Sequence, residues 1–531
     1  MTRTTLRRCA LAALALAQPA FAGPPEPSQA KIDAWWGHVE AISNDGNEGR
    51  LNGSPGYFRA ADYVIAQLRK IGVKPAGTDG YLQPMDFVEQ RFDQKASSAT
   101  LKLPTGDVPF AVPSELFYRG STAMPPTIEA PLVFAGYGLS IPEAGHDDFA
   151  GLDVKGKIVV VLSGGPASIS GALKSDARAD RAKLLAERGA LGIISLTTPK
   201  QVEIVWERQV SNSYQSSMYL ADPAMREVST PFLSATLSPA RAEALFAGSG
   251  HTFAEVAALS DASQPVPVFP LIGRFAARIT TQTKPVHGAN VIGLIPGSDR
   301  KLKGEYVVLS AHLDGLGVGE PIKGDTIYNG TFDNAIGVAS VLEAAKVLVK
   351  GKHPRRSVIL AIVTAEEKGL LGSRYFARRP TVPAGSIVAD VNLDMPLPIF
   401  ALTSVSPLGF EESSLGADAK AVAESMGLGV LPDPLPDRNA FTRSDQYSFI
   451  RQGIPALFPK YGFTRGTPEE ITERAWRANI YHSPQDQLDQ PVLKAEGVRM
   501  ADYVTALVRH IADNPVRPSW NESSYFKRFT K

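Results

Sequence analysis

The chain has 531 residues, with 55 basic and 54 acidic side chains and a formal net charge of +1. This length is too great for one ordinary domain, and 44% hydrophobic with 21% charged residues is typical of folded globular proteins and not of disordered chains. The balanced charge argues against a nucleic-acid binder, and a single cysteine excludes both an internal disulfide and a zinc site built from cysteines.

The N-terminus has the three parts of an export signal. Several arginines precede a short apolar stretch over residues 9–17, and the small-x-small triplet Ala20-Phe21-Ala22 follows it. Cys9 opens the apolar stretch, which is the wrong place for a lipid-modified cysteine. The stretch is far shorter than the roughly 20 residues that a membrane-spanning helix needs. We therefore predict a cleaved signal peptide over residues 1–22, export to the periplasm or the medium, and no membrane contact of the mature protein.

Two helices are predicted next, between residues 30 and 75. Apolar residues recur near a 3.6-residue period from Ile32 to Ile42 and again from Tyr57 to Leu68. From Asp93 to Pro126 the many Pro, Gly and Ser residues predict short strands and turns. A new unit begins near Pro131 and ends near residues 261–270. Its predicted elements are strands at 131–138, 156–165 and 191–198, and a helix at 177–188.

From Asn290 onward strands alternate with helices, and the strands are almost continuously apolar. This pattern predicts an α/β domain with a mixed, largely parallel sheet flanked by helices. The predicted strands are 290–297, 305–314, 357–367, 387–395 and 454–460, and the helices 335–350, 369–378 and 492–511. A strand-rich α/β module would interrupt this domain. We place the first part of the domain at residues 23–116, the inserted module at 117–268 and the second part at 269–531.

Acidic residues and histidines stand where these strands end. His312 and Asp314 follow one apolar strand, the pair Glu366-Glu367 a second, and Asp394 a third. In open α/β sheets ligands bind at the carboxyl ends of the strands, so these side chains are expected to converge. Two further contributors are predicted on neighbouring segments, Asp333 before a helix and His482 on a later loop.

Imidazole and carboxylate ligands without thiolate suit zinc in a hydrolytic site, with manganese or cobalt as substitutes. Two histidines and three carboxylates can hold two ions if one carboxylate bridges them. One acid of the Glu366-Glu367 pair then remains. Adjacent residues point in different directions, so this acid can face a water molecule as a general base.

Each residue also has a plain structural interpretation. Asp333 could cap its helix, the Glu366-Glu367 pair could stand at a helix start, and Asp394 could be a turn residue. His482 could be a surface side chain before a helix that begins with the capping pattern of residues 483–486. Independent accidents would not all fall at strand ends of one domain, so the joint pattern favours the metal site.

Together these segments resemble the di-zinc exopeptidase family, which includes bacterial leucyl aminopeptidases, glutamate carboxypeptidase, glutaminyl cyclases and the non-catalytic transferrin receptor. The resemblance implies the zinc-exopeptidase, phosphorylase/hydrolase-like fold, and the section from Val133 onward resembles a protease-associated (PA) domain. The segments that carry the resemblance, in order, are NVIGLIPG, SAHLDGLG, DNAIGVASVLEAA, TAEEKGLLGS, NLDM, RSDQYSF with GIPA, and YHSPQDQ.

The resemblance implies a role for each site residue. Asp333 would bridge two Zn²⁺ ions. His312 and Asp394 would complete one ion, and Glu367 and His482 the other. Glu366 matches the general base, and Asp314 the acid that orients a zinc-bound imidazole. The family also implies a cis peptide bond between Asp333 and Asn334.

Two departures from the family pattern stand out. Ile336 replaces a residue that is usually small, so packing beneath Asp333 is expected to differ. Phe441 stands where some aminopeptidases have a tyrosine that steadies the oxyanion. The oxyanion donor would then be the metal or another group, for example Tyr447 or Arg443.

The leading functional prediction is an exported zinc aminopeptidase that removes N-terminal residues from peptides. Arg438, Arg443 and Arg465 leave open a glutamate carboxypeptidase-like dipeptidase, which would need arginines for the substrate carboxylates. A glutaminyl cyclase usually binds one zinc ion and lacks the insertion, and a non-catalytic binding protein would have lost ligands. Oligomeric state and the preferred cleaved residue do not follow from the sequence.

Overall fold

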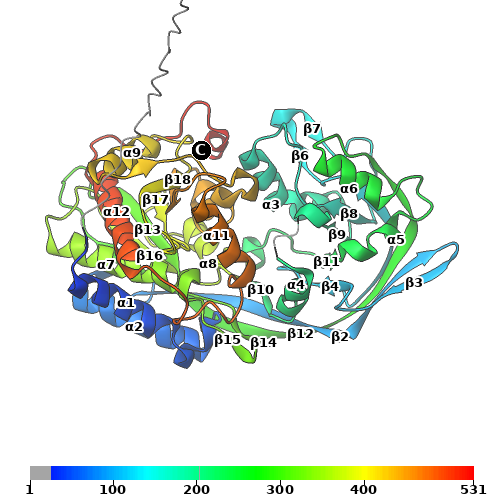
Figure 1. Ribbon diagram of the computed structural model, residues 1–531, viewed down its shortest axis with the longest axis horizontal. Helices are drawn as coiled ribbons and strands as arrows, with labels where there is room; N and C mark the ends of the chain where they lie inside the picture. Colours follow the sequence, from blue (N-terminus) through cyan, green and yellow to red (C-terminus); the bar gives the residue numbers. More distant parts are fainter. Residues whose placement is uncertain (1–25, 202–203, 531) are drawn as a thin grey trace, which may run out of the picture.

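The structure, a computed structural model, describes residues 26–201 and 204–530. The predicted signal peptide lies outside the described residues. The chain forms two lobes that are joined along one side by two long strands, β2 (Leu82–Leu103) and β12 (Val268–Ile295) (Figure 1). Among the described helices none is both long and apolar enough to cross a membrane.

The first lobe is built on a mixed, largely parallel sheet, as predicted. Its central strands β16, β13, β17 and β20 run parallel, whereas β12 and β18 are antiparallel to their neighbours at the two sides. Small strands complete its edges and one hairpin. The bounds are β1 Lys74–Pro75, β13 Tyr306–His312, β14 Gly317–Ile322, β15 Asp325–Tyr328, β16 Ser357–Val363, β17 Ile387–Asn392, β18 Ser404–Leu408, β19 Gly429–Val430 and β20 Ala456–Tyr461.

Helices cover both faces of this sheet, which explains why its inner strands are apolar throughout. Alternate residues of β13 and β16 point to opposite faces: Leu309 and Leu360 pack into one core, and Val308 and Ile359 into another. The first core contains α1 (Gln29–Ser43), α2 (Pro55–Ile71), α7 (Ile336–Lys350), α9 (Leu415–Ser425) and α12 (Lys494–Asp513), and the second contains α8 (Leu371–Arg378) and α10 (Gln446–Ile450). A further helix, α11 (Pro468–Asn479), precedes the last loop.

The second lobe contains a smaller parallel sheet in the order β5-β8-β9-β11, with β4 antiparallel at its edge. Its two faces are again both covered, since Val160 and Val161 lie in separate cores. The bounds are β3 Gly106–Phe110, β4 Leu116–Tyr118, β5 Thr127–Ala135, β6 Ser140–Ile141, β7 His146–Asp147, β8 Ile158–Leu162, α3 Gly171–Glu187, β9 Gly192–Leu196, α4 Trp206–Asn212, β10 Ser217–Leu220, β11 Leu233–Leu237, α5 Glu243–Phe246 and α6 Phe253–Asp261.

The prediction of short strands and turns between Asp93 and Pro126 was wrong for its first part. Strand β2 continues to Leu103 and pairs with β12 over most of its length. Residues 268–278 of β12 pair with β5 of the second lobe, and residues 291–295 pair with β16 of the first. The predicted strand at 290–297 is therefore only the end of a longer one. Partners more than 150 residues away stabilise the long ribbon, and local composition does not report them.

The N-terminal helices form where the sequence predicts them, with local reasons for their ends. The side chain of Ser54 accepts a hydrogen bond from the amide of Tyr57 at 3.1 Å, and Pro55 occupies the first helical position. Gly72 ends α2 in the left-handed conformation, at φ 94°. The predicted helix after Ser483 is absent: residues 483–490 form turns. Helices α4, α5, α6, α9, α10 and α11 were not predicted.

Truncation of a central core residue should lower stability strongly. Leu360 of β16 is 0% exposed, and Leu360→Ala leaves a cavity, so we expect the free energy of unfolding to fall by about 2–5 kcal/mol. Leu493 is 46% exposed, and Leu493→Ala should change it by less than about 0.5 kcal/mol. Urea unfolding followed by circular dichroism measures both, and equal losses would contradict this account of the core.

Candidate metal centre

Three parallel strands deliver side chains to one edge of the first-lobe sheet. In the ladder His312 of β13 pairs with Val363 of β16, and Ser310 pairs with Asn392 of β17. The strands therefore end close to the same level. His312 is the last residue of its strand, and Glu366-Glu367 and Asp394 follow within a few residues of theirs.

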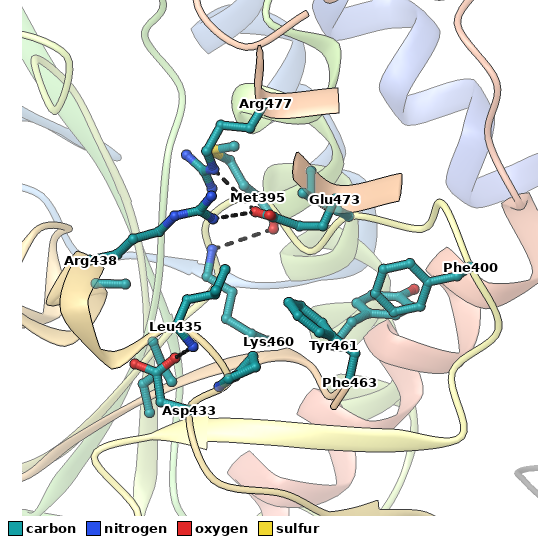
Figure 2. A pocket seen from close by; sticks show the side chains of 14 residues that line it. Met395, Phe400, Asp433, Leu435, Arg438, Lys460, Tyr461, Phe463, Glu473 and Arg477 are labelled. Atoms are coloured by element: carbon teal, nitrogen blue, oxygen red, sulfur yellow. Dashed lines mark hydrogen bonds and ion pairs between the residues drawn. The ribbon is translucent and has the colours of Figure 1, made fainter. Parts of the chain in front are cut away.

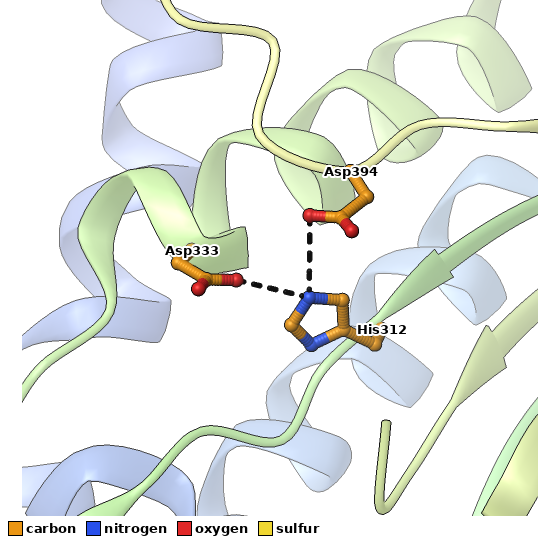
Figure 3. Close-up of side chains that lie close together, drawn as sticks. All are labelled: His312, Asp333 and Asp394. Atoms are coloured by element: carbon orange, nitrogen blue, oxygen red, sulfur yellow. Dashed lines mark ion pairs between the residues drawn. The ribbon is translucent and has the colours of Figure 1, made fainter. Parts of the chain in front are cut away.

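A first group consists of His312, Asp333 and Asp394, all buried (Figure 3). Nε2 of His312 lies 3.1 Å from Oδ1 of Asp333 and 3.5 Å from Oδ1 of Asp394. A second group consists of Asp333, Glu367 and His482. Nε2 of His482 lies 3.3 Å from Oδ2 of Asp333 and 3.2 Å from Oε2 of Glu367. Asp333 thus turns one carboxylate oxygen toward each histidine.

The two groups fit metal ions. The ligand atoms within each group lie within 4.8 Å of one another. Nε2 of His312 and Oδ1 of Asp394 are buried without a hydrogen-bond partner, which is costly unless another group contacts them. Burial by itself lowers the pKa of His482, but Glu367 and Asp333 outweigh it and raise that pKa to about 9. Excess negative charge of this kind is satisfied by a cation.

Glu366 lies beside the first group. Its carboxylate interacts electrostatically with His312 and Asp394, and burial raises the pKa of this carboxyl group well above its ordinary value. Asp314, directly behind, accepts hydrogen bonds from the amides of Glu366 at 3.0 Å and Glu367 at 3.3 Å. One oxygen of Asp314 lies 3.8 Å from Nδ1 of His312, and its carbonyl is nearer, at 3.1 Å. Asp314 therefore connects the first strand end to the second.

The backbone around these residues is unusual. The peptide bond between Asp333 and Asn334 is cis, as the family resemblance implies. Three non-glycine residues at the site adopt the left-handed conformation: Ala365 at φ 54°, Met395 at 48° and His482 at 52°. Such strained residues cost about 1–3 kcal/mol each and cluster at functional sites.

Asp486 explains why no helix begins at Ser483. Its two carboxylate oxygens accept hydrogen bonds from the amides of Phe332 at 2.9 Å and Asp333 at 3.0 Å. Its own carbonyl accepts from the amide of Thr331 at 3.1 Å. The last loop is thus fastened to the segment that carries Asp333. Sequence reasoning assigned Asp486 to a capping pattern, because the distant amides that it binds are not visible in the sequence.

Arg50 was missed by sequence reasoning, and it supports the segment after β13 and the segment that carries Asp333. Its guanidinium is fully buried and donates to four backbone carbonyls: Leu313 at 2.7 Å, Asn329 at 2.5 Å, Gly330 at 3.0 Å and Ile42 at 3.3 Å. Burial lowers its pKa to about 10, against the pull of the nearby carboxylates. The charge stays in place and partly offsets the acidic site.

A third support orients Asp394. The hydroxyl of Ser444 donates to its Oδ2 at 2.6 Å, and the amino group of Lys460 donates to its backbone carbonyl. Burial lowers the pKa of Lys460 to about 8. Neither residue was predicted, because both come from segments that lie beyond the third strand.

A largely apolar pocket opens next to Asp394, since Met395 and Lys460 line it (Figure 2). Phe400, Tyr461 and Phe463 form one wall, where Phe400 packs edge-on against the other two rings. Three charged groups of the lining are paired with one another: in Figure 2 the guanidinium groups of Arg438 and Arg477 both point to the carboxylate of Glu473. Arg438 donates a hydrogen bond to Oε1 of Glu473 at 2.6 Å, and Arg477 donates one to the same oxygen at 3.1 Å.

Tyr447 and Arg443 make their contacts elsewhere. The buried hydroxyl of Tyr447 donates to Asp176 of α3, in the second lobe. Arg443 is exposed, and its guanidinium donates to the carbonyl of Arg438 at 3.3 Å. Phe441 packs edge-on against Phe526, with ring centroids 5.5 Å apart.

Comparison with known proteins agrees with this geometry. Residues 290–508, which carry every residue of the two groups, match the family model of Peptidase family M28. The chain contains an M28 peptidase domain. The probable lipoprotein aminopeptidase LpqL of Mycobacterium tuberculosis is 26% identical over 519 residues, which cover 92% of this chain and 86% of that protein. A probable zinc metalloprotease of Leptosphaeria maculans is 34% identical over 111 residues, covering 21% of this chain and 25% of that one.

Among solved structures, an aminopeptidase from Aneurinibacillus sp. strain AM-1 has a TM-score of 0.53 and 21% identity. The match covers 92% of this chain and 95% of that chain, so both lobes take part in it, and it confirms the fold class. The M28 domain thus lies in the second part of the chain, and the N-terminal helices and Arg50 lie outside the matched residues. The peptidase assignment belongs to this domain, residues 290–508.

Removal of the Arg50 guanidinium should destabilise the M28 site. Arg50→Met leaves the carbonyls of Leu313 and Asn329 without their buried donor, so we expect the free energy of unfolding to fall by about 2–4 kcal/mol. Arg59→Met, which removes an exposed guanidinium paired with Glu48, is the control. Chemical denaturation measures both; if Arg50→Met is as mild as the control, Arg50 does not support the site.

Proposed function

We propose that the protein is a two-zinc aminopeptidase that removes residues from the free N-terminus of peptides. The observation that carries this proposal is the position of Asp333 between the two groups, with one carboxylate oxygen toward His312 and the other toward His482. His312 and Asp394 would complete one Zn²⁺ site, and Glu367 and His482 the other. Carboxylate and imidazole are the ligands that hydrolytic zinc sites use.

Zinc in such a site polarises the peptide carbonyl and makes water a stronger nucleophile at neutral pH. The chain supplies the proton carrier. Glu366 is placed to take the proton of the attacking water and to return it to the leaving amine. Asp314 keeps Glu366 and Glu367 in position through their amides. Tyr447 is not available as an oxyanion donor while its hydroxyl binds Asp176, and Arg443 is the remaining side chain of the two.

The apolar pocket beside Asp394 supports binding of the N-terminal side chain. The concentrated carboxylates of the site favour a cationic ammonium group near them. The three arginines that a glutamate carboxypeptidase-like dipeptidase would use already have protein partners. Arg438 pairs with Glu473, Arg443 donates to Arg438, and Arg465 donates to the carbonyl of Pro434 at 2.7 Å. Because Glu473 already neutralises Arg438, this arrangement favours the aminopeptidase over the carboxypeptidase.

Export and the identity of the insertion belong to the same proposal. The predicted signal over residues 1–22 supports export to the periplasm or the medium, as does similarity to a protein named as a lipoprotein. The parallel strands β5, β8, β9 and β11 with α3 support a PA-like module within residues 117–268. Such a module beside the M28 domain would restrict the substrates that reach the metal centre to peptides.

The first test compares free and blocked substrates. We expect the mature enzyme to release p-nitroaniline from leucine p-nitroanilide and to leave N-acetylated peptides ending in Glu or Asp intact. Chelation should abolish the reaction and zinc should restore it. Glu366→Gln should lower kcat by about 10²–10⁴-fold, because the proton carrier is lost while the ligands remain. Kinetics on both substrate panels, with zinc content measured for each variant, decide the matter.

Cleavage of only the blocked acidic peptides would replace the aminopeptidase assignment by the carboxypeptidase one. Turnover of neither panel by zinc-loaded enzyme would point to a cyclase or to a binding protein.

A second test counts the ions. We expect two zinc ions per chain in the wild type and about one in His482→Ala, because that substitution removes a ligand of one group only. His287→Ala, which changes an exposed histidine of β12, should keep both. Metal analysis after dialysis measures the ratio; one ion per chain in the wild type would contradict the bridging role of Asp333.

A further inference from the structure

One buried carboxylate joins the second lobe to the first. Asp176 of α3 is 4% exposed. Its Oδ1 accepts hydrogen bonds from the hydroxyl of Tyr447 and from the guanidinium of Arg451 at 2.9 Å, and its Oδ2 accepts from the hydroxyl of Tyr525 at 2.6 Å. All three donors belong to the first lobe. Hydrogen bonds to an ionised carboxylate are about twice as strong as neutral ones.

Other contacts widen this joint. Arg451 also donates to both oxygens of Asp180, one turn further along α3, at 2.9 Å each. Ala172 at the start of α3 packs, as Phe441 does, against the apolar cluster that contains Tyr447. In Figure 1, β2 and β12 run along the lower edge of the molecule, whereas α3 lies above them between the lobes. The Asp176 contact is therefore a second connection, separate from the long strands.

The first-lobe side of the joint is the segment that serves the active site. We define residues 434–451 as the pocket segment, because Leu435 and Ala440 line the apolar pocket. The segment also contains Ser444, which donates to Asp394. Ser444 and Tyr447 are linked, since the amide of Tyr447 donates to the carbonyl of Ser444 at 3.0 Å.

Helix α3 contacts this segment at its start as well as through Asp176. At its start, Gly171 lies so close to Asn439 that an added Cβ would approach the Oδ1 of Asn439 to 2.1 Å. A little further along the helix, the single carboxylate of Asp176 contacts both Tyr447 and Arg451 and so connects the lobes. Burial, followed by the charge of Asp176, raises the pKa of Tyr447 well above its usual value, so the hydroxyl keeps the proton that it donates.

We propose that Asp176 is a positioning residue of the peptidase. Through Tyr447 and Arg451 it holds the pocket segment in the arrangement that shapes the apolar pocket and orients Ser444 toward Asp394. The inference rests on the proposed aminopeptidase function and extends it, because it gives the second lobe a part in substrate selection. Loss of the carboxylate would leave buried donors unpaired and loosen the pocket wall.

A double-mutant cycle tests the proposal. Asp176→Asn, Tyr447→Phe and the double variant are compared on leucine and alanine p-nitroanilides, with zinc content measured for each. We expect each single change to lower the preference for leucine, as the ratio of kcat/KM values, by about fivefold, mainly through KM. The double variant should lose no more than a single one, because both changes remove one contact. Asp153→Asn, at a carboxylate of the same lobe that is 70% exposed, is the matched control.

Two kinetic outcomes would overturn the proposal. Multiplying effects in the double variant would mean that Tyr447 acts on the substrate independently of Asp176. An equal loss on both substrates would mean that Asp176 only keeps the protein folded.

Hydrogen exchange separates this inference from the proposed function. We expect faster amide exchange in residues 434–451 of Asp176→Asn than of the wild type or Asp153→Asn. Unchanged exchange would show that Asp176 does not hold the segment. If the wild type hydrolyses neither substrate, the aminopeptidase assignment fails, and the exchange result still decides whether Asp176 holds the pocket segment.

Discussion

Negative charge is concentrated at one edge of the first-lobe sheet, because three parallel strands end there in register. His312 is the last residue of β13, and the register of the parallel strands brings the acids that follow β16 and β17 close to it. Buried carboxylates at such short separations repel one another. The arrangement is stable only with compensating positive charge, which Arg50 and the proposed metal ions supply.

The loops at this edge are held by buried polar groups that never touch the reacting atoms. Asp314 binds the amides after β16, Asp486 binds the amides before α7, and Arg50 binds the carbonyls of both neighbouring loops. Each of these contacts satisfies backbone groups that would otherwise be buried without partners. The same bonds therefore stabilise the fold and fix the ligand positions, so a change in any of them is expected to affect both.

The two lobes share more structure than a simple insertion requires. Strand β12 pairs with β5 in one lobe and β16 in the other, so bending between the lobes would disturb a continuous ladder. The Asp176 contact adds a second connection beside the pocket. Two separated connections restrain rotation as well as bending. The second lobe is thereby held in a fixed position beside residues 434–451.

By itself the sequence determined the largely parallel α/β fold, the two N-terminal helices and the strand ends at which the site residues stand. Periodicity, capping residues and apolar strands are local properties, and parallel strands bring their ends together. The ligand roles of His312, Asp333, Glu367, Asp394 and His482 remain predictions, although the structure gathers all five. Only the tertiary structure decided the length of β2 and β12, the buried role of Arg50, and the partners of Asp486 and Tyr447. Those contacts join residues more than 150 positions apart, and no local pattern records which distant group will satisfy a buried charge.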